Sequence, residues 1–228
     1  MTANPLAYDA EVPNTGDYVR APKQERSRRS FDKAVDAAIS LLVERGSDAF
    51  TLVEVAERAG VSTGSIYTRV DSKDDLLRFA HAREMARMGQ ETEETFGAEP
   101  PAGEPFSGAV ARVIAELAVL LRDYAPILDA FMTRASQDPV IAKTGKALHF
   151  QTVDYFCAAL LTRREDISHP DPDHAVAWSC TVVYSVLARW LGLGTEPTAS
   201  GEGDWDIILA DLTEMITTYL TNPSPQTP

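Results

Sequence analysis

The sequence has few cysteines and no apolar run long enough to cross a bilayer. Cys157 and Cys180 are the two cysteines in 228 residues, too few for a disulfide framework. The most apolar stretch, residues 180–194, contains Arg189 and is shorter than the roughly 20 residues that span a membrane. The first residues lack the basic and then apolar segments of a secretory leader. We therefore expect a chain without membrane spans that works in the reducing cytoplasm.

The chain also lacks net positive charge, which taken as a whole argues against a polyanionic partner. It has 21 Lys and Arg against 34 Asp and Glu, a formal net charge of -13. The charge is segregated, however: residues 20–87 hold thirteen basic and eleven acidic residues, whereas the rest of the chain holds eight basic and 23 acidic ones. A basic run at residues 20–29 precedes a helical pattern. Such a run is usually a solvated face, but here it also suits nucleic-acid binding by the front of the chain.

Hydrophobic spacing predicts an all-α chain of about nine helices, because apolar residues recur at intervals of three and four and no strand-like alternation appears. Scattered Pro, Asn and Gly in residues 1–21 indicate a flexible arm. We predict a DNA-binding domain at 22–71 and a larger domain at 72–228. The expected helices start near Ser30, Thr51, Ser62 and Ser72, and the later ones lie at about 106–124, 127–137, 140–164, 174–193 and 205–220, with breaks at Pro126 and Pro139.

The informative segment lies between Thr51 and Val70. Ala56 is small where two helices must cross, Gly60 suits a tight turn with positive φ, and Ile66 closes a miniature apolar core. This is helix-turn-helix spacing, which presents the helix starting at Ser62 to a major groove. The side chains that we expect to be exposed on this helix can contact phosphates or base edges, and they are Ser62, Thr63, Ser65, Tyr67, Thr68 and Arg69.

Residues 28–77 resemble the DNA-binding domain of the TetR family of transcriptional regulators. The matching positions are Thr51, Val55-Ala56, Ala59-Gly60-Val61-Ser62, Gly64-Ser65-Ile66-Tyr67 and Lys73-Asp74-Asp75-Leu76. Arg69 and Val70 depart from the family pattern, which has an aromatic residue or His followed by Phe at this place. The smaller Val70 implies adjusted packing, and Arg69 implies an altered sequence preference or an added phosphate contact.

The resemblance implies a homodimeric repressor that binds a double-stranded DNA operator and is regulated by a small effector. Arg28, Arg29 and Lys73 are expected to hold phosphates, with Thr51 beside them at the interface. Independently, wide apolar faces on the last two helices predict dimerisation through Trp178, Val182, Val186, Trp190, Trp205, Ile208, Leu212 and Met215. Aromatic and apolar residues on the intervening helices predict a pocket for a mostly apolar ligand, at Met88, Leu117, Leu121, Tyr124, Phe131, Phe150, Asp154 and Tyr155, each of which also suits an ordinary core.

Other functions have weaker support in the sequence. A Gly-x-Ser-x-Gly pattern at residues 60–64 follows a helix rather than the strand that a hydrolase requires, so we expect no enzyme. The loop from His169 to His174 has metal-capable side chains but equally suits a helix cap, and we expect no metal or other cofactor. The two cysteines suit apolar cores better than redox sensors. The remaining alternative is a helical adaptor that binds protein through its helix-turn-helix.

Overall fold

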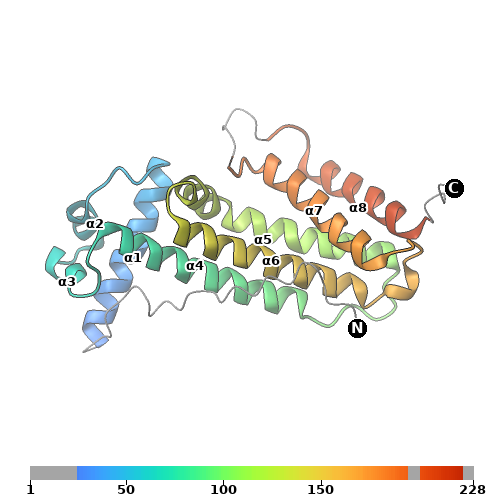
Figure 1. Ribbon diagram of the computed structural model, residues 1–228, viewed down its shortest axis with the longest axis horizontal. Coiled ribbons are helices and arrows are strands. Elements are labelled where there is room, and N and C mark those ends of the chain that lie inside the picture. The colour runs from blue at the N-terminus through green and yellow to red at the C-terminus, as the bar shows by residue number, and fades with distance from the viewer. Residues whose placement is uncertain (1–24, 195–200, 223–228) are drawn as a thin grey trace. The chain divides into compact units, whose positions relative to one another are not determined.

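The computed structural model describes residues 25–194 and 201–222, and within these ranges it confirms an all-α fold (Figure 1). The predicted N-terminal arm, residues 1–21, lies outside them. The described residues form eight α-helices, and the turn η2 (Arg164–Asp166) adds a short 3-10 segment. The α-helices are α1 (Glu25–Arg45), α2 (Leu52–Ala59), α3 (Thr63–Tyr67), α4 (Lys73–Phe96), α5 (Phe106–Ala135), α6 (Pro139–Leu161), α7 (Pro172–Trp190) and α8 (Trp205–Thr221).

The predicted break at Pro126 is wrong, which is why eight helices replace about nine. Pro126 lies inside the continuous helix α5. A proline in a helix removes one backbone N–H, here the donor to the Arg122 carbonyl, at a cost of about 3 kcal/mol. Burial on both sides offsets this cost, because Tyr124 before the proline and Phe131 after it are 3% and 2% exposed. The predicted start of the first helix at Ser30 is also wrong, since α1 begins at Glu25 in a segment of good helix formers.

The chain divides into two compact units, and α4, α5 and α6 each contribute to both. Unit 1 contains residues 1–87 and 126–148, and unit 2 contains residues 88–125 and 149–228. The boundary predicted from the sequence, between residues 71 and 72, falls inside unit 1. Unit 1 therefore includes the turn between α5 and α6 as well as the helix-turn-helix, while the functional division into domains stays a prediction.

The interior of unit 1 joins these segments. Val35, Leu42, Ile66, Leu76 and Leu77 are fully or almost fully buried in one apolar cluster, which also contains Ala130, Phe131 and Ile141 from the α5–α6 region. Ion pairs reinforce the cluster at its edge. The guanidinium of Arg134 donates to Asp48 and, at 2.7 Å, to Asp74, and Arg78 Nε donates to Asp138 at 2.9 Å. These contacts fix the end of α5 and the start of α6 against the loop after α1 and the first turns of α4.

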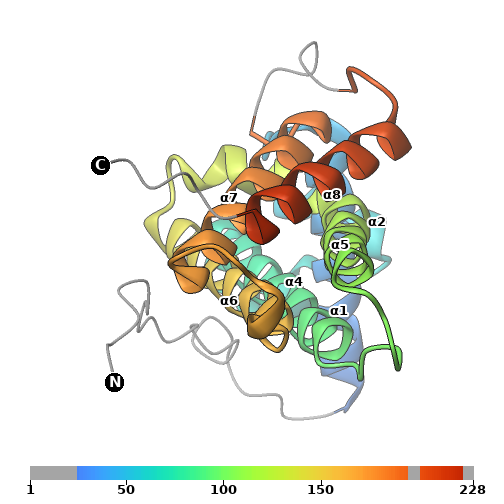
Figure 2. The same cartoon turned by 90° about the vertical axis from the view of Figure 1, so that its right-hand side faces the viewer.

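In unit 2, α7 and α8 lie side by side as an antiparallel pair (Figures 1 and 2). At one end the N–H of Ser168, before α7, donates to the carbonyl of Leu220 in α8 at 2.9 Å. At the other end the rings of Trp190 and Trp205 are 4.5 Å apart. Leu187 of α7 is fully buried, as are Phe156 and Leu160 of α6 in the same unit. Among the described helices, none has the length and apolarity to cross a membrane.

Candidate nucleic-acid interface

Helix α2 is short, and its two ends are fixed by local hydrogen bonds. The Thr51 hydroxyl accepts from the Glu54 N–H at 3.2 Å, and a Glu54 carboxylate oxygen accepts from the Thr51 N–H at 2.8 Å, which completes a capping box. The Arg45 guanidinium and the Thr51 donors lower the pKa of Glu54 to about 2. At the other end Gly60 has φ of 64°, as predicted, and the Val61 N–H donates to the Ala56 carbonyl at 3.0 Å.

Helix α3 follows after the tight turn and is anchored by one buried side chain. Ser62 caps it by accepting from the Ser65 N–H at 3.2 Å, and Ile66 is completely buried. Tyr67 is 49% exposed, and Ser62 and Thr68 are also exposed, whereas Thr63 and Ser65 are half-buried. The predicted helix-turn-helix is therefore present, with an outward face of hydroxyl groups around the end of α3.

Two of these hydroxyls already donate to the backbone, which changes what they offer to DNA. Ser65 Oγ donates to the Ser62 carbonyl at 2.6 Å, and Thr68 Oγ1 donates to the Ser65 carbonyl at 2.7 Å. Their remaining lone pairs are acceptors. In this arrangement they suit the amino groups of adenine or cytosine in the major groove better than phosphate oxygens, which need a donor.

Arg69 is not on the exposed face, so its predicted exposure is wrong. Its side chain is only 5% exposed, with the guanidinium Cζ 5.5 Å from the centre of the Phe31 ring. Its Nε and Nη2 both lie 3.4 Å from Ser27 Oγ on α1. Helix α3 has already ended at Thr68, so the side chain of the following residue turns into unit 1 rather than outward.

Lys73 and Thr51 also make contacts within the protein. Lys73 Nζ donates to the Asp48 carbonyl at 2.5 Å and lies 5.3 Å from the centre of the Phe50 ring. Thr51 is exposed, but its hydroxyl is occupied by the capping box. The ammonium also lies 3.5 Å from the Asp48 carboxylate, and because it has three N–H donors it can keep the Asp48 carbonyl while another N–H reaches a phosphate oxygen.

Four further arginines of α1 and α2 differ in their surroundings. Arg28 and Arg29 are exposed in the first turns of α1, so the described end of the basic run, from residue 25, lies within the helix, while Arg20 and Lys23 lie outside the described residues. Arg45 and Arg58 form ion pairs with Glu54 and Glu44, at 2.7 and 2.5 Å. The sequence did not single out Ser27, Asp48 or Arg134, whose partners lie 25 to 86 residues away along the chain.

Comparison with known proteins agrees with this geometry. Residues 34–79 match the family model described as bacterial regulatory proteins, tetR family. The transcriptional repressor KstR of Rhodococcus jostii is 31% identical over 173 residues, which cover 75% of this chain and 74% of KstR. The chain belongs to the TetR family. It is thus a TetR-family regulator with a helix-turn-helix, and the relatives found are named as transcriptional regulators rather than enzymes.

Solved structures show the same fold at low sequence identity. A TetR-family regulator of Mesorhizobium loti aligns with a TM-score of 0.63 at 17% identity, covering 86% of this chain and 96% of that one. FadR of Bacillus subtilis, solved with stearoyl-CoA, aligns with a TM-score of 0.60 at 17% identity, covering 83% and 98%. Both neighbours extend the fold match well beyond the residues of the family model.

The side chains predicted to bind an effector in this TetR-family chain come from both units. Met88, Leu117, Leu121 and Tyr124 are at most 3% exposed in unit 2. Phe131 belongs instead to the core of unit 1, where its ring lies 4.8 Å from that of His81. Of the remaining three, Asp154 is exposed, and Phe150 and Tyr155 are half-buried. The effector site therefore stays a prediction.

Two hollows of unit 2 are lined by other residues. One, of about 520 Å³, lies between the start of α5, at Ser107 and Ala111, and α8, from Leu209 to Thr218. The other, of about 460 Å³, lies between α4 and α5, where Glu91, Glu94, Glu116 and Asp123 surround Arg112. Arg112 there pairs with Glu104 and Glu116 at 3.2 Å. Burial raises the pKa of Glu116 against the opposing effect of Arg112.

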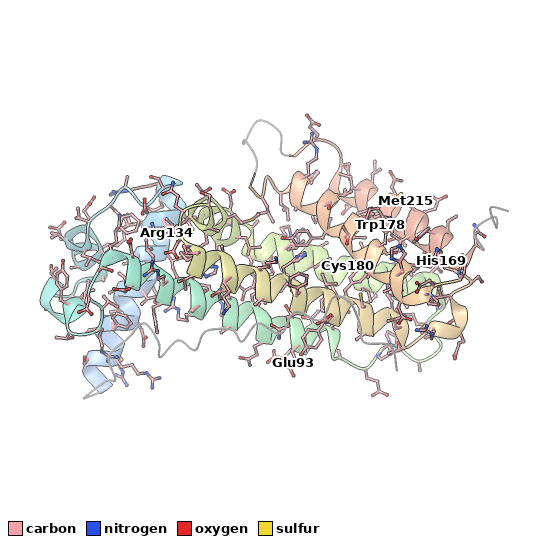
Figure 3. The ribbon with its side chains drawn as sticks, viewed as in Figure 1. Glu93, Arg134, His169, Trp178, Cys180 and Met215 are labelled. Carbon is pink, nitrogen blue, oxygen red and sulfur yellow. The ribbon has the colours of Figure 1, made fainter. Side chains whose placement is uncertain are left out.

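The predicted dimerisation residues divide by exposure. Trp178, Val186 and Met215 are exposed, at 52%, 37% and 50%, and Figure 3 labels Trp178 on α7 and Met215 on α8. Val182, Trp190, Trp205 and Ile208 are half-buried. Leu212 is 4% exposed and belongs to the interior of unit 2, and the dimerisation residues stay a prediction. On the same helix Ile207 is 60% exposed.

The remaining candidates have local roles. The Asp171 carboxylate accepts from the His174 N–H at 3.1 Å and so caps α7, while the His169 ring packs 5.1 Å from that of Tyr219. Burial raises the pKa of Cys157 to about 12 and that of the buried Cys180 further still. Both thiols are thus held protonated, which disfavours redox chemistry because the thiolate is the reactive form.

Proposed function

We propose that this chain is a ligand-responsive repressor that binds a near-palindromic operator as a homodimer and leaves it when a small, mostly apolar effector binds. In this proposal residues 22–71 bind DNA, and residues 72–228 bind the effector and dimerise. The observation that carries it is the capped α2–α3 pair, in which Ile66 anchors α3 while Tyr67 and Thr68 stay exposed. The relative KstR is named as a transcriptional repressor, which supports repression rather than activation.

The DNA-binding step is geometric and electrostatic. Each α3 enters one major groove, and two-fold symmetry sets the half-sites roughly 34 to 36 Å apart or at another spacing that the groove permits. The Ser65 and Thr68 oxygens accept from base amino groups, and the Tyr67 hydroxyl donates to a phosphate. Arg28 and Arg29 bind phosphates at the start of α1, so that affinity falls steeply with salt.

The second copy covers the exposed apolar side chains of α7 and α8. Trp178, Val186, Ile207 and Met215 each expose more than a third of their surface on this antiparallel pair. Exposed apolar surface of this kind marks interaction sites, and a two-fold contact of two helices from each protomer makes a four-helix interface. The chain outside residues 20–87, with 23 acidic against eight basic residues, then repels DNA, which restricts DNA binding to residues 20–87.

The effector acts in unit 2. FadR was solved with stearoyl-CoA, and this likeness supports an acyl compound as the first candidate effector class. Because Met88, Leu117, Leu121 and Tyr124 are almost fully buried, the ligand must displace side chains of the interior as it enters. A coupling of about 1 to 3 kcal/mol between ligand and operator requires that DNA weaken ligand binding by the same factor.

The experiment measures the binding of duplex DNA by the protein and, by titration calorimetry, the binding of the effector. Anisotropy of a labelled duplex of random sequence, measured over a range of salt concentrations, should give an affinity that falls steeply with salt. Stearoyl-CoA should bind the protein and lower its affinity for the duplex, whereas free CoA, which lacks the acyl chain, should do neither. A folded protein without salt-dependent duplex binding would refute the regulator proposal and favour the protein-binding adaptor. Equal binding of CoA and stearoyl-CoA would refute the apolar effector alone.

A further inference from the structure

Arg69 is a buried cation at the end of the recognition helix, and its contacts lead to the start of α1. Within unit 1 its guanidinium reaches Ser27 Oγ with two nitrogens at 3.4 Å and stacks 5.5 Å from the centre of the Phe31 ring. A cation within about 6 Å of an aromatic centroid is attracted to the ring face. A guanidinium that is 5% exposed cannot reach a phosphate without leaving both partners.

The residues that it touches stand next to the exposed arginines of α1. Ser27 directly precedes Arg28 and Arg29, and all three lie in the first turns of the helix. The first four N–H groups of any helix lack partners within the helix, so its first turn frays unless other contacts hold it. Phe31, the other partner of Arg69, is 3% exposed and packs against Phe79 of α4 with the ring centres 5.1 Å apart. Ser27 and Phe31 both lie on α1, so Arg69 links the first turn of this helix to its buried next turn and to the end of α3.

We propose that Arg69 is a positioning residue that holds the first turn of α1 beside the end of α3, so that Arg28 and Arg29 meet the phosphates next to the groove that α3 enters. Arg69 itself makes no contact with DNA. This role rests on the proposed function, because it acts through the binding of duplex DNA. It differs from the phosphate contact that the sequence alone suggested for Arg69.

The geometry supplies matched variants. Ser27→Ala removes the hydroxyl that Arg69 reaches and leaves every charge in place, while Arg69→Gln removes the guanidinium. Arg58→Gln is the control for lost positive charge, because Arg58 is exposed in the same unit and pairs with Glu44 instead. The double variant Arg28→Ala with Arg29→Ala removes the groups through which Arg69 acts.

The first measurement is amide hydrogen exchange of the protein without DNA. Arg69→Gln and Ser27→Ala should each speed exchange at residues 29–31 by about fivefold, the effect of losing one weak polar contact of roughly 1 kcal/mol. Arg58→Gln should leave these amides unchanged. Unchanged exchange at residues 29–31 in Arg69→Gln would overturn the proposal whether or not the protein binds DNA.

The second measurement is duplex affinity against salt, with a labelled duplex of random sequence. Arg69→Gln and Ser27→Ala should each weaken binding by about tenfold, and Arg69→Gln should have no further effect in the Arg28→Ala, Arg29→Ala background. A direct phosphate contact predicts instead that Ser27→Ala binds as the wild type does. It also predicts that Arg69→Gln lowers the salt slope by about 0.9 per contact in either background, and this outcome would overturn the proposal.

These results separate the inference from the proposed function. If no variant, including the wild type, binds duplex DNA, the proposed function fails and the DNA-positioning role of Arg69 falls with it. Faster exchange in the two variants would then show that the contact with α1 exists without that role. If the wild type binds and the exchange and additivity results fail, the regulator stands and the assignment of Arg69 is wrong.

Discussion

Acid should destabilise unit 1 through one buried histidine. His81, on α4, is 4% exposed, with its ring 4.8 Å from that of Phe131. Its Nε2 lies close to α6, where a Cβ placed on Gly145 would be 3.8 Å away. Burial lowers the pKa of His81 from 6.5 to about 4, against the smaller opposing effect of Asp138. The folded state therefore disfavours the imidazolium.

The sign and size of the effect follow from this pKa. Between pH 6.5 and about 4 the unfolded chain binds a proton at His81 that the folded chain does not, so stability falls as the pH falls through this window. Above pH 6.5 both states are neutral at His81 and the residue contributes no pH dependence. The full difference is about 3 kcal/mol at 1.36 kcal/mol per unit, and about 2 kcal/mol of it should be lost between pH 7 and pH 5.

The assay is urea unfolding followed by circular dichroism at pH 7 and pH 5, for the wild type and for His81→Leu. Other titrating groups affect both proteins equally, so the wild type should lose about 2 kcal/mol more than His81→Leu between the two pH values. His149→Leu is the matched comparison: burial lowers the pKa of His149 as well, but this histidine lies in unit 2, beside Tyr184, so the variant should keep the loss of stability that His81 causes. Identical pH dependence of the wild type and His81→Leu, or an NMR titration of His81 near pH 6.5, would refute the reasoning.

Three further predictions concern the helix-turn-helix, the ion pairs and the dimer. Thr51→Ala should lower stability by about 1 kcal/mol because it removes the capping hydroxyl, and thermal unfolding should show Thr51→Ser close to the wild type. Arg134→Gln, at the position labelled in Figure 3, should lower the urea midpoint of unit 1, and by less at high salt, because it removes the pairs with Asp48 and Asp74; a midpoint loss that salt does not reduce would contradict this. Trp178→Ser with Met215→Ser should turn dimers into monomers in analytical ultracentrifugation, whereas Val119→Ser, an equally exposed apolar position on α5, should not.

The sequence predicted what depends on neighbouring residues. Helix starts near Thr51, Ser62 and Ser72 were predicted from their place before apolar patterns, and each of these hydroxyls accepts a backbone N–H three residues on. Gly60 was identified from the need for positive φ in a tight turn. These features rest on contacts across three or four residues, so a single sequence contains the information.

The sequence did not predict contacts between distant segments. Arg69 reaches Ser27 across 42 residues, and Arg134 reaches Asp48 across 86, so no local pattern reveals either contact. The amphipathic pattern of α8 marked Leu212 and Met215 alike as apolar, but only the packed structure separates the buried residue from the exposed one. Pro126 illustrates the reverse error, because local propensity predicted a break that tertiary burial overrides.

The most direct test of the central claim is selection of bound sequences from a pool of randomised duplexes, with Tyr67→Ala as the test variant. Tyr67 is 49% exposed on α3, so the variant should stay folded, and Met132→Ala, at a 41% exposed site on α5, is the control. We predict that the wild type and Met132→Ala enrich the same near-palindromic motif, with half-sites on one face of the duplex, and that Tyr67→Ala weakens or loses it. A folded wild type that enriches no motif, or Tyr67→Ala enriching the motif as strongly as the wild type, would contradict the account.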